Sequence, residues 1–224
     1  MMPKLPVILL VSLLASPAAA QHRGEEPRAC VPAGERFINY DRERSEDWAQ
    51  EVARLRKNAG DVTRQDDKLT LALDDGRSVD LQDCPFGDAG YQYLYERYDA
   101  PGRFYVVRTP AYDDLYYTLV MKRTGRLTKL FGTPVWASDK SRFLTVACSL
   151  QPQRATLTIY SVRDDALAAD GEFPLPCERE SCSARWDFQS WISVACTPRD
   201  DAGKRGTEFT LLRASDGTWK NMGR

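Results

Sequence analysis

The chain has 224 residues, of which 28% are charged and 42% hydrophobic, and its formal net charge is −1 at pH 7. Lysine and arginine balance aspartate and glutamate along the whole chain, which argues against the clustered basic surface that nucleic acid would require. The only histidine is His22, and most hydrolase sites and ordinary zinc sites need a placed histidine. We therefore expect no catalytic residues, no metal, no cofactor and no nucleic-acid partner.

Residues 1–20 have the order of a secretory signal peptide. Lys4 provides an early positive charge, an apolar run extends from Leu5 to Leu14, and three alanines precede the expected cleavage after Ala20. The apolar run is too short to cross a bilayer, which needs about 20 residues. We predict an exported, periplasmic or secreted protein without a transmembrane segment in the mature chain, beginning with a polar segment at 21–40.

All six cysteines lie after the signal peptide. An even number of cysteines in an oxidising compartment favours disulfide bonds, and the absence of a C-x-x-C motif disfavours zinc. We predict a Cys30–Cys84 bond, a Cys148–Cys196 bond and a local bridge between Cys177 and Cys182. Six cysteines permit many other pairings, which the sequence leaves open.

The mature chain is long enough for one domain, which we place at 41–224. A helix is predicted at about 45–58, where Trp48, Val52 and Leu55 recur at helical spacing. Its apolar stripe packs on the parent domain or, alternatively, binds a partner. A β-hairpin follows at about 68–81, where leucines alternate with polar residues on either side of a tight Asp-Gly turn.

Two observations indicate an internal repeat after this hairpin. The predicted turn glycines Gly76, Gly125, Gly171 and Gly217 are 49, 46 and 46 residues apart. In addition, the segment FLTVACS at 143–149 matches WISVACT at 191–197. We place the repeats at about 90–131, 134–176 and 184–222.

A period of this length, built of short strands, is typical of β-propeller blades. The segment around Trp136, Asp139, Arg142 and Phe143 resembles the strand-loop-strand signature of WD-like and Tol-type propellers. The chain is also similar to uncharacterised exported bacterial β-repeat proteins. The resemblance implies an all-β domain with one N-terminal helix, forming a small or incomplete propeller of about four repeats, and it implies no activity. Whether the repeats close into a ring or form an open stack is left undecided.

Aromatic residues are the main candidates for binding. Tyr91, Tyr93 and Tyr95 alternate and therefore share one face of a strand, where they either bind a partner or pack in the core. The turn residues Tyr112, Asp113 and Asp114 combine an aromatic anchor with carboxylates and form the best candidate recognition loop.

These features favour a non-enzymatic exported binding protein, with another envelope protein as partner and inhibition or immunity against an envelope enzyme as its concrete form. One alternative is a carboxylate-dependent enzyme acting on sugar or peptidoglycan, although the acidic pairs lie in predicted turns. Another is a structural accessory of the envelope that pairs through exposed strand edges. The oligomeric state stays open.

Overall fold

The computed structural model describes residues 46–84, 91–110, 115–148, 155–163, 166–175, 177, 180–198 and 206–222. The predicted signal peptide and the polar segment at 21–40 lie outside these residues. The described chain contains one helix, α1 (Glu46–Lys57), followed by fifteen strands. No helix in this part of the chain is long and apolar enough to cross a membrane.

The strands form four successive antiparallel sheets. The first sheet contains β1 (Val62–Gln65), β2 (Lys68–Ala72) and β3 (Ser78–Gln82). The second contains β4 (Leu94–Asp99), β5 (Phe104–Pro110), β6 (Leu115–Met121) and β7 (Leu127–Phe131). The third contains β8 (Val135–Trp136), β9 (Arg142–Ala147), β10 (Thr156–Arg163) and β11 (Ala166–Pro174). The fourth contains β12 (Glu180–Phe188), β13 (Trp191–Pro198), β14 (Thr207–Arg213) and β15 (Trp219–Asn221).

Each sheet is a meander in which strands that follow one another in the chain are also neighbours in the sheet. The three four-stranded sheets occupy the segments in which the sequence predicted repeats. The two copies of the matched motif lie on β9 and β13, the second strands of consecutive sheets. In chain order, α1 precedes the three strands of the first sheet and so takes the place that a first strand has in the other repeats.

One predicted turn is wrong. Asp170 and Gly171 lie within β11, beside a β-bulge opposite Ile159, and not at the end of a strand. The Asp170 carboxylate accepts hydrogen bonds from Arg142 Nε and Ser161 Oγ, both at 2.9 Å, which holds this segment in the sheet. The other turn glycines, Gly76, Gly125 and Gly217, do have positive φ angles.

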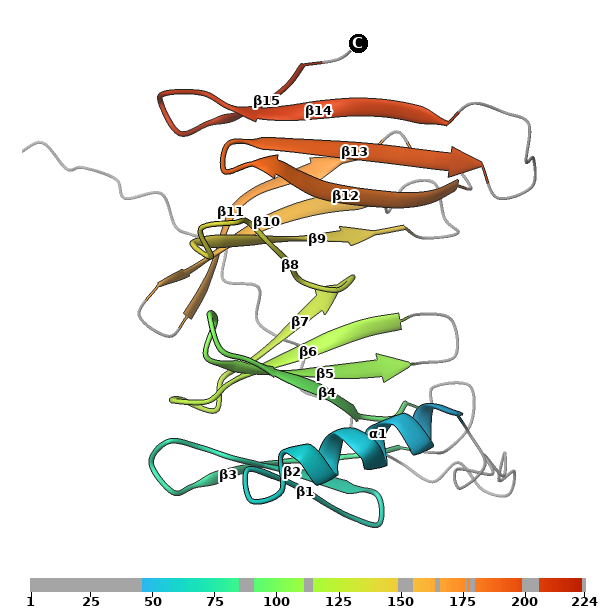
Figure 1. Ribbon diagram of the computed structural model, residues 1–224, viewed down its shortest axis with the longest axis vertical. Coiled ribbons are helices and arrows are strands. Elements are labelled where there is room, and N and C mark those ends of the chain that lie inside the picture. The colour runs from blue at the N-terminus through green and yellow to red at the C-terminus, as the bar shows by residue number, and fades with distance from the viewer. Residues whose placement is uncertain are drawn as a thin grey trace, which may run out of the picture.

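The four sheets stack along the longest axis of the molecule (Figure 1), and three apolar layers hold neighbouring sheets together. Leu69 and Leu71 of the first sheet meet Tyr105 of the second. Phe104 of the second sheet contacts Phe143 of the third, with ring centroids 5.8 Å apart. The third and fourth sheets meet through equivalent residues of the matched motif, since Leu144 and Ile192 share one cluster.

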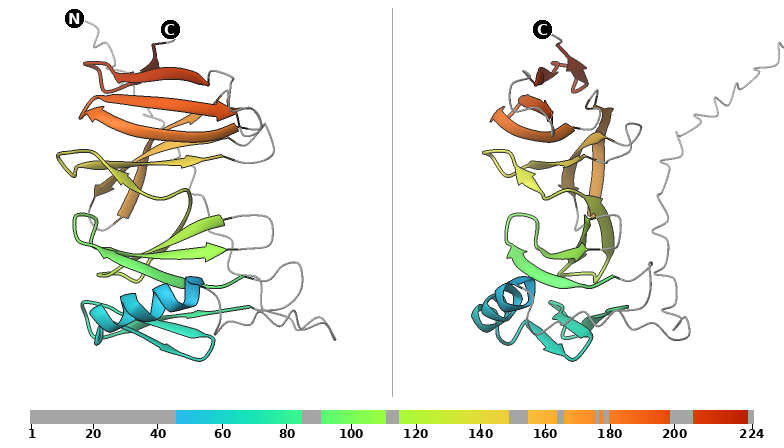
Figure 2. Two further views of the ribbon diagram at one scale, coloured as in Figure 1. Left: turned by 45° about the vertical axis from the view of Figure 1, so that its right-hand side comes forward. Right: turned by 90° about the vertical axis from the view of Figure 1, so that its right-hand side faces the viewer.

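The stack is open. The first and fourth sheets lie at opposite ends of the molecule in Figure 1 and in both views of Figure 2. The outer face of the first sheet carries Thr63, Thr70 and Asp80, and that of the fourth carries Ser183, Arg185, Ser193 and Thr210. Ring closure would press these two polar faces together with little apolar surface to bury, whereas polar end faces are what a solenoid-like stack requires. The domain is therefore an incomplete, propeller-like set of four sheets.

Two disulfide bonds lie at the junction of the last two sheets, and their pairing corrects the prediction. Cys148 follows β9 and bonds to Cys182 of β12, whereas Cys177 precedes β12 and bonds to Cys196 of β13; the Cα–Cα distances are 5.7 and 5.4 Å. The predicted Cys148–Cys196 bond is wrong because these residues occupy equivalent positions in consecutive sheets, which pack about 10 Å apart.

The predicted Cys177–Cys182 bridge is wrong as well. Cys182 and Cys196 are cross-strand neighbours in the fourth sheet, and each bonds to a cysteine that precedes β12. Cys84 is disulfide-bonded, and Cys30, its predicted partner, lies outside the described residues.

Candidate functional site

The recognition loop predicted at Tyr112, Asp113 and Asp114 lies outside the described residues. The alternating tyrosines are described, and they belong to the layer between the first and second sheets. Tyr93 and Tyr95 are 7% and 0% exposed, and Tyr91 is half-buried against them. Of the two roles that the sequence left open, Tyr93 and Tyr95 have the core-packing one, because another sheet covers this strand face. Burial raises the pKa of Tyr95 to about 12.

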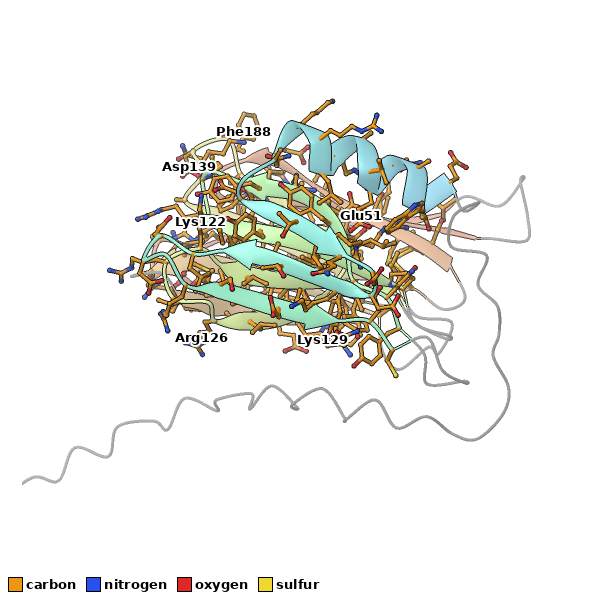
Figure 3. All side chains as sticks on the ribbon, turned by 90° about the horizontal axis from the view of Figure 1, so that it is seen from below. Glu51, Lys122, Arg126, Lys129, Asp139 and Phe188 are labelled. Carbon is orange, nitrogen blue, oxygen red and sulfur yellow. A yellow bond between two sulfur atoms is a disulfide. The ribbon has the colours of Figure 1, made fainter. Side chains whose placement is uncertain are left out.

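A buried ionic cluster, which the sequence did not reveal, joins helix α1 to the first two sheets. Arg64 of β1 donates hydrogen bonds to Glu51 Oε1 at 3.0 Å and to Asp83 Oδ2 at 3.1 Å. The three side chains are between 0 and 3% exposed, and Glu51 is labelled beneath the helix in Figure 3. The same carboxylates accept backbone N–H groups of Tyr95 and Tyr93, both at 2.8 Å. All of these contacts are made within the fold, so this Arg64 cluster is a structural feature.

The described acidic pairs are turn residues, as the sequence predicted. Asp66 and Asp67 connect β1 to β2, and Asp74 and Asp75 connect β2 to β3. Asp75 Oδ1 accepts the backbone N–H of Arg77 at 3.0 Å, and this bond lowers the pKa of the Asp75 carboxyl. Within the described ranges no three His, Cys, Asp or Glu residues are placed to hold a metal ion.

The outer face of the fourth sheet is the strongest candidate for a binding site. It is hollowed over β12, β13 and β14, with a volume of about 220 Å³. The side chains that alternate toward this face form cross-strand rows, of which one is Arg185, Ser193 and Thr210 and the next is Ser183, Ala195 and Glu208. The face is hollow here because most of these side chains are small.

Three polar side chains at this face are held in place by one another. The Asp187 carboxylate accepts a hydrogen bond from Arg185 Nε at 3.0 Å and a short one from the Ser193 hydroxyl. The Ser193 bond, followed by the bond from Arg185, lowers the pKa of Asp187, so its carboxylate is charged at neutral pH. Arg185 is nevertheless 78% exposed. The face thus presents fixed donors and acceptors together.

Two exposed aromatic rings lie one cross-strand row beyond the residues that line the hollow. Phe188 and Trp191 are 67% and 43% exposed, and their ring centroids are 6.1 Å apart. They are direct cross-strand partners, and Trp191 is two residues from Ser193 on the same strand, so both rings lie on the outer face. Phe188 is labelled at the margin of the molecule in Figure 3. We refer to this pair as the aromatic ledge.

The sequence contains a signal for this ledge. In the matched motif, Trp191 corresponds to Phe143, which is fully buried between the second and third sheets. Trp191 belongs to the last repeat, where no further described sheet covers it. A large aromatic residue in the last copy of a repeat, at a position that earlier copies bury, therefore indicates an exposed aromatic surface.

Comparison with known proteins identifies no family for the chain. No family model and no curated protein matches it. Among solved structures, it is similar to the β-propeller domain of the Trilobed protease from Pyrococcus furiosus, described as having an open velcro topology. The match has 14% sequence identity and a TM-score of 0.29, and it covers 70% of this chain and 52% of that chain.

Proposed function

We propose that this protein is a non-enzymatic exported binding protein of the cell envelope, and that it binds its partner through the outer face of the fourth sheet. The observation that carries the proposal is the aromatic ledge beside a hollow lined with fixed polar groups. Aromatic anchors next to well-placed polar groups are typical of recognition sites, because they offer a large contact area at a low entropic cost.

The scaffold supports this role. The Cys148–Cys182 bond and a continuous apolar layer attach the fourth sheet to the third, and Cys177–Cys196 joins the segment before β12 to β13. The candidate face is therefore held rigid before binding. A preorganised site loses less conformational entropy on association. Export agrees with the sequence pattern at residues 1–20 and with the disulfide bonds, which persist in oxidising compartments.

Another envelope protein is the partner expected from the sequence, and inhibition of an envelope enzyme is the concrete form of that interaction. The alternative of a carboxylate-dependent enzyme requires two carboxylates that face each other across a cleft. The described acidic pairs lie instead in the turns at 66–67 and 74–75, so no observation favours that alternative.

The test is a crosslinking pull-down with the mature chain from its own envelope fraction. The double variant Phe188→Ala/Trp191→Ala should lose the partners that the wild-type protein captures. Thr70→Ala, on the outer face of the first sheet, is the matched control and should retain them. Tyr112→Ala/Asp113→Ala/Asp114→Ala tests the loop favoured by the sequence. If the ledge variant retains every partner while the loop variant loses them, the binding face proposed here is wrong.

A further inference from the structure

The outer faces of the first and fourth sheets both end the stack, but their side chains differ more than this shared position requires. Both are polar, and polarity is sufficient to keep an end sheet from aggregating. On the first sheet, the outer face is made of Thr63, Gln65, Thr70, Asp80 and Gln82, with no aromatic residue among them. The fourth sheet adds the aromatic ledge, which a face selected only for solubility would not contain.

The ledge and the hollow occupy successive cross-strand rows of the same face, which we call the track. This face has three successive rows of cross-strand neighbours, which contain Trp191, Ser193 and Ala195 of β13. The first row holds the ledge, the second holds Arg185 and Ser193, and the third holds Ala195 and Glu208. A ligand on this track would rest on aromatic rings at one end and reach hydroxyl, carboxylate and guanidinium groups at the other.

The charges on this track limit the chemistry of the ligand. Arg185 and Asp187 pair with each other at 3.0 Å, so neither requires a charge from the ligand. Arg185 and the hydroxyls can donate hydrogen bonds, while Asp187 and Glu208 can accept them. Glu208 disfavours an anion on this track. The matching ligand therefore carries no negative charge, has many groups that both donate and accept, and has an apolar face for the rings.

From this juxtaposition we infer that the outer face of the fourth sheet is a carbohydrate-binding site for an uncharged sugar chain, with a sugar ring stacked on Trp191 and its hydroxyls bound by the Arg185–Asp187–Ser193 group. This inference rests on the binding face of the proposed function and assigns that face a glycan ligand, where the sequence favoured a protein partner. The C–H groups of a pyranose ring form the apolar surface that an exposed tryptophan accepts, and the ring hydroxyls supply both donors and acceptors. A peptide lacks this combination in each successive unit.

Isothermal titration calorimetry of the mature protein with N-acetylglucosamine hexamer and with cellohexaose tests the inference, together with cosedimentation on isolated peptidoglycan sacculi. We expect saturable binding to at least one of these glycans. Binding to sacculi and to the N-acetylglucosamine hexamer would identify peptidoglycan strands as the source, whereas binding to cellohexaose alone would identify a glucan.

Variants locate the site. Trp191→Ala should weaken glycan binding at least about tenfold, and Ser193→Leu should do the same by filling the hollow. Thr70→Ala is the control and should bind as the wild type does. Both affected side chains lie on the uncovered face, so equal denaturant midpoints would show that the variants remain folded.

The possible failures are distinguishable. If no glycan binds, but the envelope pull-down recovers a protein that the ledge variant loses, the carbohydrate inference is overturned and the proposed binding function stands. If glycan binding occurs but is unchanged in both Trp191→Ala and Ser193→Leu, the site is elsewhere and the inference is wrong. If neither glycan nor protein depends on the ledge, both proposals fail.

Discussion

Replacing Arg64 with methionine should destabilise the fold more than any exposed substitution. Arg64 is 3% exposed, and its guanidinium is the cation that faces both Glu51 and Asp83 in the Arg64 cluster. Methionine fills a similar volume but removes the counter-charge that Arg64 supplies to both buried carboxylates. Removing one partner of a buried ion pair costs about 3–5 kcal/mol, and here two anions lose their ion pair with Arg64. We therefore expect a loss of about 4 kcal/mol in the free energy of unfolding.

A second variant separates charge from packing. In Glu51→Gln/Arg64→Met/Asp83→Asn all three charges are removed, while the oxygens that accept the backbone N–H groups of Tyr95 and Tyr93 are kept. Replacing a whole buried ionic group with well-packed hydrophobic residues is often neutral or stabilising, and the amides used here likewise leave no buried charge unpaired. The triple variant should therefore recover at least half of the loss caused by the single substitution.

Urea unfolding of the oxidised protein measures both variants, with far-UV and near-UV circular dichroism followed together to check that the transition is cooperative. The expected order of stability is wild type, triple variant, then Arg64→Met. A loss below about 1 kcal/mol in Arg64→Met would refute the assigned role of the cluster, since it would match an ordinary surface change. If the triple variant is as unstable as the single one, the loss comes from packing and not from unpaired charge.

Three further predictions concern the framework. Gly132→Ala should cost at least about 1 kcal/mol more than Gly76→Ala in urea unfolding, because both glycines have positive φ but only at Gly132 would a Cβ meet a carbonyl oxygen of β9, at 2.2 Å. Cys148→Ser/Cys182→Ser should lose about 2–4 kcal/mol, and peptide mapping of the oxidised wild type should recover this pair joined. Burial raises the pKa of Tyr95 from 10.0 to about 12. The protonated side chain therefore makes its full contribution to the free energy of unfolding below pH 10, and this contribution is lost as the pH rises toward 12. Spectrophotometric titration of tyrosinate, compared with the pH dependence of unfolding, checks this prediction.

The spacing of repeats along the chain was predictable, because sheet repeats depend on local alternation and turn residues. Alternation places the leucines of β2 on one face, and that face is buried as expected. Strand β1 was missed because Val62 is its only buried apolar residue. The turn at Asp170–Gly171 was wrongly predicted because turn residues also occur at bulges, where contacts to other strands decide the conformation.

Features that depend on the stacking of sheets were not predictable from the sequence. The Arg64 cluster joins residues 51, 64 and 83, and nothing in their spacing indicates that they meet. The tyrosines at 93 and 95 alternate like any half-buried strand, and only the position of the first sheet shows that their face is covered. The disulfide pairing was wrongly predicted for a related reason. Cys148 and Cys196 occupy equivalent positions of the matched motif, so they belong to different sheets and bond to other cysteines.

The polar end faces explain why the stack stays open, and this explanation can be tested on the first sheet. Thr70 donates a hydrogen bond to Asp80 at 2.7 Å, and Lys68 pairs with the same carboxylate at 3.2 Å, so polar side chains occupy the centre of the outer face. In Thr70→Val/Asp80→Val this centre becomes apolar while β propensity is preserved. Two copies should then pack face to face as neighbouring sheets do within the chain, so light scattering should show a mass that rises with concentration above the wild-type value. Asp80→Asn removes the charge without adding apolar surface and should behave like the wild type; if the valine variant does so too, polarity of the end face is not what keeps the stack open.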